Sequence, residues 1–236
     1  MLEPDATTRT AEHPSVPASR FGPDALQILT TEHWSLLATR SLVYTEAMSR
    51  TSIFIAALSG AVVALALVAQ ATDFGSGFVA FALVLLPVVY FLGWATIVRL
   101  SQVNYENARW VQGMNRIRHA YLDIAPELEP YFVTSKYDDN PGILATVMPG
   151  LGSAAPHQAF VSAPGIVAVI NAVVAGAVAG VVGMALDLGV AWSLVLGAAG
   201  FLASIAGFLA WAKGKIGEFR SGHEPLFPSP PGDDRA

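Results

Sequence analysis

Long runs of apolar residues divide the chain into four segments, each with the length of a membrane span. They cover residues 52–71, 75–98, 164–186 and 188–212, and none of them contains a charged residue. A helix needs roughly 20 mainly apolar residues to cross a hydrocarbon layer of about 30 Å. Within lipid, only helices and closed barrels satisfy the polar groups of the backbone. The pattern therefore predicts an all-α integral membrane protein with four transmembrane helices.

The four segments are paired by very short connections. Residues 72–74 join the first two spans, and Asp187 joins the last two, so the spans form two hairpins, within residues 23–125 and 164–212. Neither connection contains Lys or Arg, whereas these residues occur before the first span, between the hairpins and after the last span. Short loops that are rich in Lys and Arg stay in the cytoplasm. Both termini are therefore predicted to be cytoplasmic.

Apolar residues continue the helical spacing beyond the membrane in the first hairpin. In residues 23–50 and 99–125 they recur at alternating steps of three and four, as in a coiled-coil seam. The two spans are therefore predicted to extend into a cytoplasmic antiparallel helical hairpin. In the matching register Leu36 faces Met114, and Arg40 lies level with Trp110 as a cation–π pair. This hairpin is either a stalk that docks a partner or two helices that cover each other's apolar faces, and the second is the commoner use of such a pattern.

The second hairpin carries small residues at helical spacing, which let helix backbones approach closely in lipid. These residues are Ala172, Gly176, Gly180, Ser193, Gly197, Gly200 and Ser204. They pack either within the hairpin or between subunits, and the second alternative predicts a homo-oligomer. Two polar residues inside the spans, Asn171 and Ser59, are candidates for lining a pore or for bonding between helices.

The remaining segments are rich in proline. Residues 1–22 are predicted to be a disordered cytoplasmic tail, and within the cytoplasmic tail 213–236 the same is predicted from residue 224 onward. Residues 126–163 form a linker that is interrupted by four prolines after Pro126. Its apolar part, residues 142–148, is either a short amphipathic piece on the membrane surface or a turn within the linker.

Composition and the absence of known motifs argue against several classes of activity. Only 13% of the residues are charged, and cysteine is absent, so the chain has no thiolate nucleophile and no cysteine-based metal site. The spans contain no ionisable residue of the kind that marks proton relays. No phosphate loop, zinc motif or nucleophile elbow occurs. The net charge of −5 argues against nucleic acid as a partner. We expect no enzymatic activity, no cofactor and no metal, with the lipid bilayer as the main partner.

The order of cytoplasmic helix, two-span hairpin and second cytoplasmic helix over residues 24–125 resembles the SLATT-type two-transmembrane domains of bacterial conflict systems. The stretch from Arg40 to Tyr44, together with Arg50, carries the likeness. The resemblance implies a pore-forming membrane effector, and it leaves the second hairpin outside the comparison.

Abundant alanine, glycine and valine, with ten arginines to three lysines, indicate a bacterial gene and hence the plasma (inner) membrane. The functional hypotheses are an oligomeric pore or channel, or a structural or signalling scaffold that acts through the cytoplasmic hairpin with a protein partner. A transporter or an enzyme is the least favoured.

Overall fold

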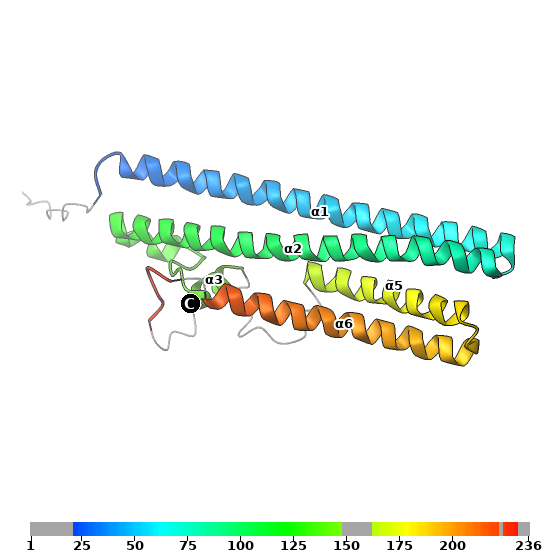
Figure 1. Cartoon of the computed structure of the whole chain (residues 1–236). Helices are drawn as coiled ribbons and strands as arrows, with labels where there is room; N and C mark the ends of the chain where they lie inside the picture. Colours follow the sequence, from blue (N-terminus) through cyan, green and yellow to red (C-terminus); the bar gives the residue numbers. More distant parts are fainter. Residues whose placement is uncertain (1–20, 148–161, 222–223, 231–236) are drawn as a thin grey trace, which may run out of the picture.

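Four long helices dominate the computed structural model, which describes residues 21–147, 162–221 and 224–230 (Figure 1). The elements are α1 (Ala25–Thr72), α2 (Ser76–Ile124), the 3-10 helix η1 (Pro126–Tyr131), α3 (Asn140–Val147), α5 (Ala163–Ala185) and α6 (Gly189–Ser221). Helices α1, α2, α5 and α6 are long and apolar enough to cross a membrane. The prediction of an all-α protein with four membrane spans is confirmed.

The two hairpin turns reverse the chain within three residues each. Asp73 and Phe74 adopt left-handed backbone angles, with φ of 46° and 56°, between α1 and α2. Asp187 and Gly189 do the same between α5 and α6, with φ of 52° and 77°. Aspartate and glycine tolerate this conformation better than most residues, which is why the apolar runs break at these positions.

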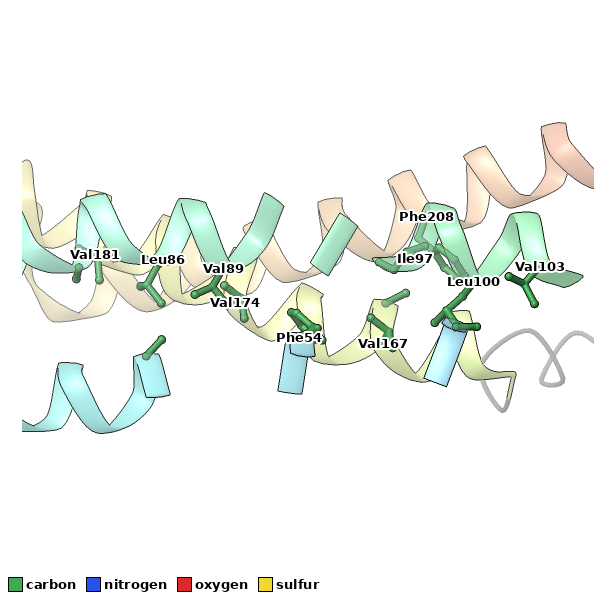
Figure 2. Close-up of a cluster of buried hydrophobic side chains, with 14 residues drawn as sticks. Phe54, Leu86, Val89, Ile97, Leu100, Val103, Val167, Val174, Val181 and Phe208 are labelled. Carbon is green, nitrogen blue, oxygen red and sulfur yellow. The ribbon is translucent and has the colours of Figure 1, made fainter. Parts of the chain in front are cut away.

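The long helices lie side by side in the order α1, α2, α5 and α6, with α1 against α2, α2 against α5, and α5 against α6 (Figure 1). Their buried side chains form one apolar core that runs through the membrane region and into the start of the stalk. Figure 2 shows Phe54 of α1 directed into this core, which Val89 of α2 and Val167 and Val174 of α5 also line. Helix α2 contacts α1 in its own hairpin and α5 in the second hairpin, and it thereby joins the two hairpins.

The small residues of the second hairpin bring α5 and α6 into backbone contact. A Cβ added to Gly176 would lie 2.9 Å from the carbonyl oxygen of Gly197, and one added to Gly197 would lie 3.1 Å from the carbonyl oxygen of Gly176. Added to Gly200, it would lie 2.8 Å from the Cβ of Ala179. For Gly180 the nearest atom is the carbonyl oxygen of Ser193, at 3.5 Å. These glycines therefore lie at contacts between α5 and α6 within the hairpin.

Beyond the membrane spans, α1 and α2 continue side by side as a two-helix stalk, residues 25–51 and 99–124. Leu36 packs against the small apolar cluster that contains Met114 and Ile143. The Nε of Arg40 donates to the buried Oδ1 of Asn107 at 2.7 Å, and its guanidinium carbon lies 5.9 Å from the ring centroid of Tyr44. The sequence predicted that Arg40 pairs with the ring of Trp110 on α2. In the structure the aromatic ring beside Arg40 is that of Tyr44, on α1 itself.

Candidate functional site

The C-terminal segment Glu224–Pro230 lies against the stalk end of α2 and the segment before α3 (Figure 1). The backbone N–H groups of Leu226 and Phe227 donate to the two carboxylate oxygens of Asp138, at 3.0 and 2.7 Å. The N–H of Asp138 donates in turn to the carbonyl of Phe227 at 3.1 Å. The predicted disorder of the C-terminal tail is therefore wrong for residues 224–230. Residues 1–20 and 231–236, also predicted to be disordered, lie outside the described residues.

Asp138 is the centre of this junction and has no solvent-exposed surface. Besides the two backbone groups, the Nε of Arg116 donates to its carboxylate at 2.6 Å, and Gln112 donates to its backbone carbonyl at 3.0 Å. Burial acts to raise the pKa of Asp138. The N–H of Leu226, the guanidinium of Arg116 and the N–H of Phe227 together outweigh burial and lower this pKa below its ordinary value of 3.8. The carboxylate is therefore held ionised.

Asp139 binds the C-terminal segment at Ser229. Its Oδ2 accepts hydrogen bonds from both the backbone N–H, at 2.8 Å, and the hydroxyl of Ser229. Its Oδ1 accepts from the N–H of Gly142 at 2.9 Å, so the same side chain caps the first turn of α3. The ring of His119 stacks on Phe227 with centroids 4.0 Å apart. We name Arg116, His119, Asp138 and Asp139 the tail clamp.

Asn115 of α2 forms hydrogen bonds with the segment around Asp138. Its Nδ2 donates to the carbonyls of Tyr137 and Gly142, at 2.7 and 3.2 Å. Its Oδ1 accepts from Arg118 and Thr146, at 2.7 and 3.2 Å. The side chain of Asn115 is fully buried, and these four hydrogen bonds satisfy both its amide nitrogen and its amide oxygen. The apolar part of the linker is thus packed on α2 as α3, and residues 148–161 lie outside the described residues.

Ion pairs join α1 to α2 where the stalk meets the membrane. Nη2 of Arg99 lies 2.7 Å from the carboxylate of Glu46, which Arg50 also contacts at 2.8 Å. The hydrogen bond from Arg99, followed by that from Arg50, lowers the pKa of Glu46 to about 2. Arg99 also reaches Glu106 at 3.1 Å. These ion pairs join the two helices at one level of the stalk.

Inside the membrane, Asn171 is the polar group with the most unusual surroundings. It is 1% exposed, and neither its Oδ1 nor its Nδ2 has a hydrogen-bond partner. The side chain rests on α2 at Gly93, where an added Cβ would lie 2.1 Å from its Oδ1. The other interior polar groups are placed differently. The hydroxyls of Ser204 and Tyr90 lie 3.3 Å apart, Ser193 bonds to the carbonyl of Gly189, and Ser59 is on the exposed side of α1.

His33 and His119 stack on different rings. His33 stacks on Tyr121 with centroids 6.1 Å apart, and burial followed by the charge of Arg118 lowers the pKa of His33. His119 belongs to the tail clamp. Over the part of the chain that the structure describes, no three His, Cys, Asp or Glu side chains converge on a point where a metal could sit.

The sequence pattern missed the tail clamp. A local signal was present, because Asp139 precedes Asn140 and Pro141, and a carboxylate before proline is typical of a helix start. That signal predicts the cap on α3. It says nothing about Phe227 or Ser229, which come about 90 residues later in the chain.

No protein-family model, curated protein or solved structure matches this chain. The resemblance of residues 24–125 to SLATT-type domains therefore has no support beyond the order of the helices.

Proposed function

We propose that this protein is a structural or signalling scaffold of the bacterial inner membrane that acts through its cytoplasmic stalk on a protein partner. The observation that carries the proposal is the tail clamp. It ties the chain that leaves the last span, α6, to the stalk that continues the first two spans. A movement of the second hairpin is then transmitted to the stalk through Asp138 as well as through the helix contacts in the membrane.

The proposal assigns both termini to the cytoplasm. Its support is the distribution of Lys and Arg, which are absent from both hairpin turns, together with the clamp, which requires residues 224–230 and residues 116–139 to be on one side. We expect fusions of a reporter that is active only outside the cytoplasm to give signal after Asp73 and after Asp187. Fusions after Asp123 and at the C-terminus should be silent. Signal at Asp123 would reverse the orientation.

The transmission can be measured by a distance between spin labels. The chain has no cysteine of its own, so Arg109→Cys on the stalk and Lys213→Cys at the end of the last span can be labelled selectively. In the full chain in lipid nanodiscs we expect one narrow distance distribution, which broadens when Asp138→Ala removes the central carboxylate. A distribution that stays narrow would mean that the clamp does not couple the second hairpin to the stalk, and the scaffold proposal would lose its mechanism.

An oligomeric pore is the second candidate, and one observation favours it. The amide of Asn171 is buried in the membrane region without a partner, and a polar group in that position is costly unless water or another polar group reaches it. If Asn171 lines a pore, the protein in planar bilayers should conduct ions, and Asn171→Ala should alter that conductance. If the protein is a scaffold only, bilayers with the native chain and with the variant should both be silent.

A further inference from the structure

Helix α1 has an outer face, directed away from α2, that is exposed and uncharged from Trp34 to Ala66. It starts at Trp34 and recurs at alternating steps of four and three residues, through Ala38, Ser41, Thr45, Met48 and Ser52, and on to Ala66 in the membrane. The charged residues of α1 all lie off this face. Trp34 is 68% exposed, although it precedes the first span by 18 residues of helix, so lipid does not cover it.

Two hydroxyl groups on this face, those of Thr45 and Ser52, are already bonded within the helix. Thr45 donates to the carbonyl of Ser41 at 3.0 Å, and Ser52 donates to that of Met48 at 3.0 Å, each within α1 itself. A surface that covers these two positions can therefore be apolar and close-fitting without leaving either donor unsatisfied. In this respect the face resembles the contact surfaces of paired helices.

The face extends through two environments, and this restricts what can cover it. Lipid covers only its membrane part, whereas a soluble protein covers only the part before residue 52. A partner for the whole face must itself have a span that continues as a cytoplasmic helix of similar length. α1 of a second copy has this form.

The area of the face reaches the size of a specific interface. From Trp34 to Ala66 the face extends for about 50 Å along α1. With a contact strip of about 10 Å, each copy buries roughly 500 Å², and the two copies together bury roughly 1,000 Å², which is the total area that a specific protein interface should reach.

We propose that two copies of this chain pair in parallel along the outer face of α1. Copies inserted in the same direction are related by a two-fold axis along the membrane normal, so each residue of the face meets its own counterpart. The alternating steps of four and three residues are those of a left-handed helix pair, and small residues such as Ala38 and Ser52 allow close approach. The pairing depends neither on the scaffold proposal nor on the pore proposal.

Single cysteines in the full-length protein in membranes test the pairing, because a disulfide requires Cα atoms within about 7 Å. We expect oxidation to convert Ala38→Cys, Thr45→Cys and Ser52→Cys to covalent dimers. The yield should be about fivefold or more above that of Thr39→Cys. Thr39 is the matched control because it is exposed next to Ala38 but lies about 100° further around the helix. Equal yields at positions 38 and 39 would overturn the proposal.

The mass of the native protein in nanodiscs gives a second, independent measurement. We expect a dimer, and we expect Trp34→Glu with Ala38→Glu to shift most of it to monomer while the helix content by circular dichroism stays the same. A native monomer would mean that lipid, another protein or the N-terminal residues occupy the face, and the proposal would be wrong. A dimer that persists unchanged in the double variant would place the interface elsewhere and would equally overturn it.

Discussion

Replacing Asp138 by alanine is expected to release residues 224–230 from the stalk. The substitution removes the carboxylate that accepts hydrogen bonds from two backbone N–H groups and from Arg116. The guanidinium of Arg116 is partly exposed, so water can replace its lost partner. The loss should be about 2–3 kcal/mol of docking free energy, since bonds to a buried charge are stronger than neutral ones. A fluorophore on Leu226→Cys, a position that is 63% exposed, reports the release as a fall in anisotropy.

Glu127→Ala is the control for this variant. Glu127 is an exposed carboxylate on η1, so its removal changes the net charge by the same amount and should leave the anisotropy unchanged. An equal fall in both variants would mean that overall charge, and not the geometry around Asp138, holds the segment.

The docking should also depend on pH. The pKa of Asp138 is lower in the folded protein than its ordinary value of 3.8, so the released state binds more protons than the docked state. The stabilisation from this carboxylate is fully present above pH about 4 and is lost as the pH falls through the lowered pKa of the docked state. The anisotropy of the native chain should therefore fall on acidification below pH 4 and recover on neutralisation, whereas Asp138→Ala should lack this transition.

Gly93→Ala is expected to destabilise the contact between the two hairpins. The new methyl group would lie 2.1 Å from the Oδ1 of Asn171 and 2.4 Å from its Cγ, so the buried amide must move within a packed interface. Such overpacking costs typically about 1–3 kcal/mol. Denaturation of the purified protein in mixed micelles measures the change in the free energy of unfolding.

A double-mutant cycle separates this clash from other effects of the new side chain. Asn171→Ala removes both unpartnered polar atoms and should be neutral or stabilising on its own. In that background Gly93→Ala should cost little, giving a coupling energy of about 1–3 kcal/mol. Gly207→Ala is the control, because nothing lies within 4 Å of its added Cβ. A cost of Gly93→Ala that is the same in both backgrounds would show that Asn171 does not rest on Gly93.

The membrane architecture follows from local sequence because hydrocarbon demands long uncharged helices, and the turns follow from breaks in those runs. Asn171 could also be singled out from the sequence, since an amide in a span is costly wherever it lies. That it rests on Gly93 could not, because Gly93 is a small residue in an apolar helix and shows no pattern that selects a partner.

The tail clamp could not be predicted for a related reason. A proline-rich segment with one phenylalanine has the composition of a disordered tail, and its order comes from carboxylates that folding supplies from elsewhere. Asp138 and Phe227 are 89 residues apart in the chain, and one sequence contains no information on such a pairing. The use of the small residues in α5 and α6 was left open for the same reason, since their spacing does not tell an intramolecular contact from an intermolecular one.

The bonds between Asp138 and Phe227 close a chain loop of about 90 residues around the second hairpin. For a flexible chain in water, closing a loop of that length costs roughly 4 kcal/mol in entropy. Here most of the loop consists of α5 and α6, which are long and apolar enough to cross a membrane, so the bilayer fixes the direction of both helices. The entropy has largely been lost on insertion, so a short peptide with a few hydrogen bonds and one stacked ring suffices to keep the loop closed. Outside the bilayer the same bonds would face the full entropic cost.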